Sequence, residues 1–149
     1  FSTAAEAGAK SVHSTDEIAK KAALIGELIG VAFQIKDDIF DYNASDELGK
    51  PTGNDMKEGK LTLPALYVLN TYQDSSMVDL ALKIRALEAS DEEIARFIDY
   101  VKQHGGLEYA SPVMVDYRNQ ALGMLPEAAS QAVKDAVAAY IDYVIERKK

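Results

Sequence analysis

The chain has 149 residues, 48% of them hydrophobic, and a formal net charge of −8. This length suits one globular domain, and the acid excess argues against a nucleic-acid partner, because such proteins concentrate positive charge. The absence of cysteine excludes disulfides and zinc–thiolate sites. No run reaches the roughly 18 apolar residues of a transmembrane segment, and no signal peptide follows Phe1, so we expect a cytoplasmic protein.

Helical periodicity dominates the N-terminal third. The alanine-rich residues 1–12 predict one helix, with a break at His13. Ser14 and Glu17 have the spacing of a capping box, which predicts the start of a second helix that continues to about Tyr42. Residues 43–60 follow as an extended irregular segment, and such long loops in compact domains are usually functional or disordered.

The remaining sequence also favours helices. A short helix is expected from about Thr62, with Pro64 in its first turn, and another over residues 77–89. Ser90 and Glu93 form a second capping box. The last two helices are expected over residues 107–125, where Pro112 marks a start or a kink, and at the C-terminus, where the apolar stripe is Val133, Ala136, Val137, Tyr140, Ile141 and Val144. The fold class is therefore all-α, with six or so helices.

The long second helix carries a polar stripe near its end. At 3.6 residues per turn, Gln34, Asp37, Asp38 and Asp41 fall within an arc of roughly 100°. The rest of the surface of residues 25–40 is mostly apolar, which is typical of a helix surrounded by others. We therefore expect the stripe to open into an internal cavity.

Three grouped aspartates need a cation to offset their repulsion. Asp37 and Asp41 form an i,i+4 like-charge pair, which costs roughly 0.2–0.5 kcal/mol even on an exposed helix. Oxygen ligands without histidine or cysteine favour Mg²⁺ over zinc, and Mg²⁺ commonly fills its shell with substrate phosphates. The competing interpretation is a solvated acidic face in an acidic protein.

The following loop supplies cations that such phosphates require. Lys50 and Lys60 each follow a glycine, and both are candidate diphosphate ligands because ammonium groups stabilise phosphate oxygens. Asp55 could hold one of these lysines or a metal-bound water. Considered alone, each lysine would be an ordinary surface residue and Asp55 an ordinary turn residue.

Three ordered blocks together carry a family resemblance. They are Phe33-Gln34-x-x-Asp37-Asp38-x-x-Asp41, Gly49-Lys50-x-x-Gly53-Asn54-Asp55 and Glu58-Gly59-Lys60-x-Thr62-Leu63-Pro64. This series resembles the trans-type polyprenyl diphosphate synthases, and its first block is similar to their second aspartate-rich motif. The resemblance implies the all-α isoprenoid (terpenoid) synthase helical bundle, with residues 1–149 as the C-terminal part of a single polyprenyl synthetase domain whose N-terminal half is absent.

The resemblance also implies an activity, the Mg²⁺-dependent condensation of an allylic diphosphate with isopentenyl diphosphate in isoprenoid biosynthesis. The family's first aspartate-rich motif and the basic set that holds isopentenyl diphosphate have no counterpart in this chain. We therefore expect these 149 residues to be inactive alone, and the full-length protein to be a homodimer.

Site roles carried over from the family fall on the matching positions. Asp37 would bind Mg²⁺, with Asp38 and Asp41 acting directly or through metal-bound water, and Gln34 would face the developing allylic cation. Substrate contacts would come from four residues: Phe33 as a cavity wall, Lys50 and Lys60 on the allylic diphosphate, and Asp55.

Two other classes remain open. The chain could be a non-catalytic helical subunit or regulatory module of a heteromeric prenyl synthase, although such a module has no reason to keep the aspartate and lysine cluster. A class I terpene cyclase would share the fold and the Mg²⁺–diphosphate chemistry. Those enzymes generally carry an Asn/Ser/Glu-type second metal motif, so the aspartate-rich block favours the chain-elongating enzymes.

Overall fold

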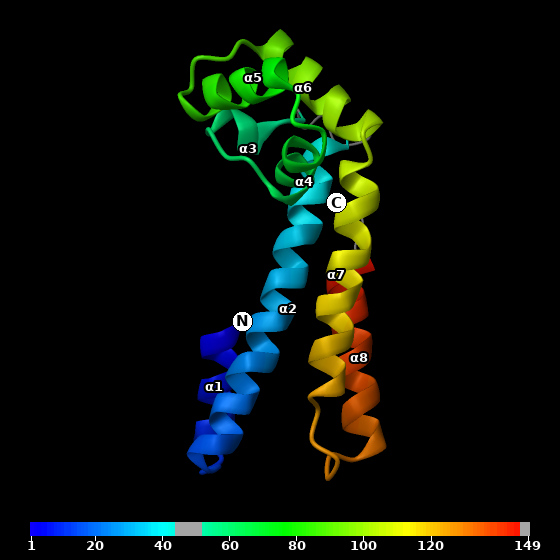
Figure 1. Cartoon of the computed structure of the whole chain (residues 1–149). Coiled ribbons are helices and arrows are strands. Elements are labelled where there is room, and N and C mark those ends of the chain that lie inside the picture. Colours follow the sequence, from blue (N-terminus) through cyan, green and yellow to red (C-terminus); the bar gives the residue numbers. More distant parts are fainter. Residues whose placement is uncertain (44–51, 147–149) are drawn as a thin grey trace. The chain divides into compact units, whose positions relative to one another are not determined.

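The computed structural model describes residues 1–43 and 52–146, and the regular structure in these residues is entirely helical (Figure 1). The helices are α1 (Ser2–Ser11), α2 (Asp16–Tyr42), α3 (Asn54–Lys57), α4 (Leu63–Tyr72), α5 (Ser75–Arg85), α6 (Asp91–Gln103), α7 (Gly106–Gly123) and α8 (Gln131–Glu146). The predicted all-α class is therefore confirmed. Helix α3 was not expected, because it lies in the segment that the sequence predicted to be irregular.

The chain divides into two compact units. The first joins Phe1–Gln34 to the chain from Val113 onward, and the second is Ile35–Pro112. Helices α1 and α8 belong to the first unit, whereas α3, α4, α5 and α6 belong to the second. Within the described residues, no helix combines the length and the apolar character that a membrane crossing requires.

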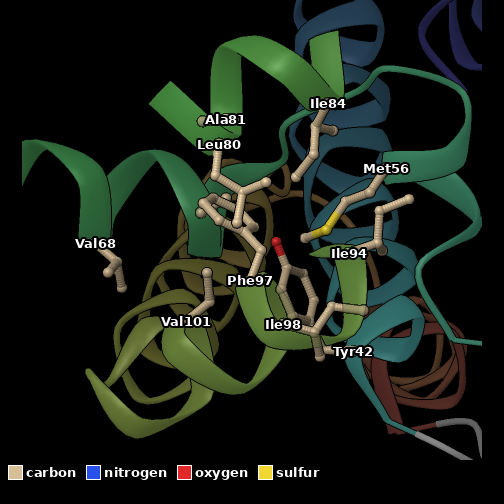
Figure 2. Packing of buried hydrophobic residues seen from close by; sticks show 11 residues of the cluster. Tyr42, Met56, Val68, Leu80, Ala81, Ile84, Ile94, Phe97, Ile98 and Val101 are labelled. Carbon is tan, nitrogen blue, oxygen red and sulfur yellow. The ribbon is translucent and has the colours of Figure 1, made fainter. Parts of the chain in front are cut away.

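The core of the second unit is a continuous hydrophobic cluster. Its central side chains, which include the ring of Phe97, are fully buried, and Figure 2 shows Met56 of α3 among them. The buried members are Tyr42, Met56, Ala65, Val68, Leu80, Ala81, Ile84, Ile94, Phe97, Ile98 and Val101. All of α3 to α6 thus contribute to one core, which explains how four short helices can pack stably.

The first unit has a smaller core. Ile29 of α2, Ala121 of α7 and Ile141 of α8 are buried together. An ion pair also joins α7 to α8, because Arg118 Nε lies 2.7 Å from Asp142 Oδ1 and Arg118 Nη2 lies 3.0 Å from Asp142 Oδ2. Helix α1 contributes no buried residue to this unit.

Helix starts differ in part from their predictions. Helix α6 has the expected capping box, because Ser90 Oγ accepts the Glu93 N–H and the Glu93 side chain accepts the Ser90 N–H. At α2 the predicted cap was wrong by one residue: Thr15 Oγ1 accepts the Ile18 N–H, whereas the Ser14 hydroxyl is buried with no hydrogen-bond partner among the described atoms. Both hydroxyls precede an acidic first turn, so spacing alone did not separate them.

The apolar stripe predicted for the last helix is only half right. Ile141 and Val144 of α8 are buried, as expected. Val133 and Tyr140 are exposed, and the buried face continues through Ile145 instead. A stripe drawn from hydrophobicity alone cannot distinguish the face that meets α7 from apolar residues that remain exposed.

Candidate functional site

The acidic end of α2 does not present its three carboxylates equally. Asp38 is 8% exposed, whereas Asp37 and Asp41 are partly exposed. The helix period explains the difference, because Asp38 lies three residues after buried Ile35 and four before buried Tyr42. Asp37 and Asp41, four residues apart, share the neighbouring face, which is the more accessible one.

Asp41 connects this helix end to the start of α3. Its Oδ1 accepts the Asn54 N–H at 2.9 Å and its Oδ2 accepts the Asp55 N–H at 3.0 Å. Its backbone carbonyl accepts the Gly53 N–H at 3.0 Å. Three consecutive backbone N–H groups are therefore held by one residue, and a carboxylate suits this role because it accepts at both oxygens.

Two glycines and one methionine shape the segment that Asp41 holds. Gly53 and Gly59 have φ angles of 79° and 75°, in the left-handed region that glycine adopts without strain. A Cβ on Gly53 would also lie 2.9 Å from side-chain atoms of Ile94 and of Ile98. Met56, between the two glycines, is 2% exposed and anchors the segment in the hydrophobic cluster.

Lys60 follows the second glycine and lies between two carboxylates. Its Nζ is 2.6 Å from Glu58 Oε2 and 3.7 Å from Asp55 Oδ1, and its backbone N–H donates to the Asp55 carbonyl at 2.8 Å. The bond to Glu58 is the main reason that the pKa of Lys60 is raised above its ordinary value. The expected pairing of Asp55 with one of the lysines is therefore present, but the closer contact of Lys60 with Glu58, two residues before it, was not predicted.

A buried tyrosine lies close to the same carboxylates. The Tyr42 hydroxyl is 3.2 Å from Thr62 Oγ1, and Thr62 is the N-cap residue of α4. Burial raises the pKa of Tyr42 well above its ordinary value, and the negative charges of Asp38 and Asp41 raise it further, against the opposing hydrogen bond with Thr62. The hydroxyl thus stays protonated and ties the end of α2 to the start of α4. No sequence pattern indicated this pairing.

The three remaining candidate residues are Lys50, Phe33 and Gln34. Lys50 lies outside the described residues. Phe33 and Gln34 belong to the first unit, where Gln34 is exposed and the Phe33 ring packs against Phe1 with 5.2 Å between ring centroids. Their substrate roles stay predictions.

The described part of the chain contains no group of three or more histidine, aspartate or glutamate side chains that could hold a metal ion by themselves. The site does present the accessible carboxylate of Asp37 and the ammonium of Lys60. Oxygen donors suit a hard cation, and an exposed ammonium suits a phosphate.

The chain is similar to known proteins in both sequence and fold. A family model described as polyprenyl synthetase matches residues 1–101. A short chain isoprenyl diphosphate synthase of Methanothermobacter thermautotrophicus is 36% identical over 125 residues, covering 83% of this chain and 38% of that protein. The structure of a geranylgeranyl pyrophosphate synthase from Bacteroides thetaiotaomicron is 47% identical, with a TM-score of 0.92 over 99% of this chain and 48% of the other.

A third relative was solved with ligands. The structure of a polyprenyl synthase from Caulobacter crescentus, complexed with calcium and isoprenyl diphosphate, is 28% identical with a TM-score of 0.83, and the match covers 100% of this chain and 46% of that one. The chain thus spans less than half the length of each of these three relatives. The solved relatives share its all-α arrangement at high similarity.

Proposed function

The chain belongs to the polyprenyl synthetase family, and from this premise we propose that it is the C-terminal part of one polyprenyl synthetase domain. The whole protein would be a trans-prenyltransferase that condenses an allylic diphosphate with isopentenyl diphosphate. Support comes from the family match and from relatives named as isoprenyl and geranylgeranyl diphosphate synthases. Homodimer formation and a cytoplasmic location stay predictions for that whole protein.

One observation carries the proposal. The acidic end of α2 and the lysine segment, which we define as residues 53–60, are joined by the three bonds to Asp41, so that Asp37 and Lys60 belong to one connected structure. A metal-dependent diphosphate site needs both a carboxylate for the ion and a cation for the outer oxygens. An acidic surface patch would require no such connection.

The donor chemistry fits Mg²⁺. Asp37 offers a partly exposed carboxylate, and Mg²⁺ is usually bound through one or two carboxylates together with substrate phosphates. The Caulobacter relative, solved in complex with calcium and isoprenyl diphosphate, supports the binding of a divalent ion and of a diphosphate. We propose Asp37 as the Mg²⁺ ligand, with Asp38 buried behind it. When bound, the ion would offset the negative charge that develops on the leaving diphosphate.

The chain's own residues would bind, orient and shield the reacting groups. Lys60, and Lys50 outside the described residues, would bind the oxygens of the allylic diphosphate. Gln34 would face the allylic cation, and Phe33 would form part of an apolar wall that excludes water. The allylic C–O bond would break to release diphosphate, the alkene of isopentenyl diphosphate would form a C–C bond with the allylic cation, and the proton then lost would pass to the released diphosphate.

The test uses the full-length gene product in Mg²⁺ buffer with both diphosphates. We expect Asp37→Ala to lower turnover about 10²–10³-fold, the usual effect of removing a group that stabilises developing charge. Asp99→Ala, which removes an exposed aspartate of α6 in the same unit, is the matched control and should retain wild-type turnover. Equal rates for wild type and Asp37→Ala would remove Asp37 from the site.

The same assay separates the alternative functions. Incorporation of labelled isopentenyl diphosphate identifies a chain-elongating synthase, whereas a terpene cyclase would consume the allylic diphosphate alone. A non-catalytic subunit would give no product unless a partner chain is added. The 149 residues by themselves should form no product, and product formation from both diphosphates would refute the expected inactivity of this portion.

A further inference from the structure

The carboxylate of Asp41 is held against the start of α3. Both of its oxygens accept backbone N–H groups, from Asn54 at 2.9 Å and from Asp55 at 3.0 Å. Each bond has the length of a good N–H···O hydrogen bond, and the ionised acceptor makes it stronger than a neutral one. These two bonds determine where α3 begins relative to the end of α2.

The segment that follows transmits this placement to Lys60. Gly53 and Gly59 set the turns at its two ends, and the buried side chain of Met56 prevents it from shifting along the core. The N–H of Asp55 is held by Asp41. The Asp55 backbone carbonyl accepts the Lys60 N–H at 2.8 Å, and Asp55 Oδ1 lies 3.7 Å from Lys60 Nζ. Asp55 therefore touches both Asp41 and Lys60.

We propose that Asp41 is a positioning residue, which acts on diphosphate binding through Asp55 and Lys60 and not as a ligand of the metal ion. This proposal rests on the proposed function, since Lys60 is its point of action. Asp37 lies on the same face of the helix but binds the ion directly. The two ends of the aspartate motif thus have different tasks: one serves the metal ion and the other the lysine.

Asparagine at position 41 is the informative substitution. In asparagine an NH₂ group replaces one of the two carboxylate oxygens, so a donor faces one of the two backbone N–H groups and that hydrogen bond is lost. The loss of a hydrogen bond to a charged group should displace Lys60 and so weaken diphosphate binding about tenfold. The helix propensities of the two side chains are similar, so the end of α2 is preserved.

The test is a double-mutant cycle in the full-length gene product. Calorimetry measures the Kd for inorganic pyrophosphate in Mg²⁺ buffer for wild type, Asp41→Asn, Lys60→Met and the double variant. We expect each single variant to raise Kd about tenfold and the double variant to raise it no further than the larger single effect. The control cycle pairs Asp37→Asn with Lys60→Met, and its effects should multiply.

Asp55→Asn guards against misfolding, because it leaves the backbone N–H bonds to Asp41 in place and removes only the Asp55 charge from Lys60, whose contact with Glu58 at 2.6 Å is unchanged. It should give the same rise in Kd and the same lack of further effect with Lys60→Met. An Asp41→Asn effect that multiplies with Lys60→Met overturns the positioning role, and so does an Asp55→Asn variant with wild-type affinity.

Wild-type behaviour separates the two proposals. A protein that binds pyrophosphate but makes no prenyl product refutes the proposed function, while the cycle still decides the role of Asp41. A wild-type protein that does not bind pyrophosphate refutes both.

Discussion

The two units build their cores from different side chains. In the second unit, the aromatic rings of Tyr42 and Phe97 are buried within a continuous cluster. In the described part of the first unit, the buried hydrophobic side chains include no aromatic ring, and the cluster at its centre is Ile29, Ala121 and Ile141. Met56 anchors the lysine segment in the core of the second unit.

This difference teaches how a short polar segment can be held in place. Helix α3 has only four residues, too few to be stable by itself. It persists because Met56 is buried in the cluster and because Asp41 accepts the N–H groups at its start. The position of the residues at the candidate site is therefore fixed by core packing and by one carboxylate, more than by the helix itself.

The largest effect should come from the aromatic centre of the second unit. Phe97→Ala removes a ring that is 0% exposed and should lower the free energy of unfolding by about 3–5 kcal/mol, because it leaves a cavity. Chemical denaturation measures this. Val133→Ala, at a 52% exposed position in the first unit, is the control and should change stability by less than about 0.5 kcal/mol. Similar losses for both variants would contradict the central place of Phe97 in the core of the second unit.

Glycine substitutions should have opposite signs in the two units. Gly53→Ala places a Cβ at φ 79° and 2.9 Å from two isoleucine side chains, so it should cost about 1–3 kcal/mol. Gly8→Ala, inside α1 with open space around it, should stabilise the protein by about 0.4–1 kcal/mol. Thermal and chemical unfolding check both signs, and a neutral Gly53→Ala would mean that the turn is not constrained as described.

Helix capping offers a smaller contrast. Ser90→Ala removes the hydroxyl that accepts the Glu93 N–H and should cost about 1 kcal/mol. Helix α1 has no side-chain cap, so Ser2→Ala at its first residue should stay within about 0.5 kcal/mol of wild type. The two unfolding midpoints, measured side by side, decide whether the cap contributes as expected.

The smallest effect concerns acid sensitivity in the second unit. The hydrogen bond from Lys83 and the bond from the Ser90 N–H hold the pKa of Glu93 below its ordinary value of 4.5. The stabilising contribution of Glu93 is therefore present above pH 4.5 and is lost as the pH falls through the lowered folded-state pKa. Glu93→Gln should flatten this part of the pH–stability curve, and Lys83→Met should flatten it in the same direction. An unchanged slope in both variants would contradict the assigned cause.

The succession of the longer helices along the chain was predictable because hydrophobic periodicity and capping residues are local signals. The run of periodic residues that ends at Tyr42 and the box formed by Ser90 and Glu93 were both confirmed. Helix α3 was not predictable from periodicity, since four residues are too short for a pattern and the helix depends on the burial of Met56. The cap at Thr15 was missed because two adjacent hydroxyl residues offered the same signal.

For the candidate site, the sequence indicated which residues to consider, but it did not indicate their burial or their long-range contacts. Spacing placed Gln34, Asp37, Asp38 and Asp41 on one polar stripe, whereas the structure has Gln34 exposed, Asp37 and Asp41 partly exposed and Asp38 buried. Asp38 is buried because it lies on the same helix face as Ile35 and Tyr42, and this face packs on the core. The bonds of Asp41 to Asn54 and Asp55 span 13 and 14 residues, and no local pattern encodes contacts at that separation.

The burial of Met56 has a consequence for oxidative damage. The chain has no cysteine, so its four methionines are its sulfur atoms open to oxidation. While α3 is packed in the core, the Met56 side chain is only 2% exposed, so peroxide should reach its thioether mainly when α3 moves away. Conversion to the polar sulfoxide would then disfavour its return. The rate of sulfoxide formation at this residue therefore reports how often the lysine segment opens, and each oxidised molecule would lose the anchor that holds Asp55 beside Lys60.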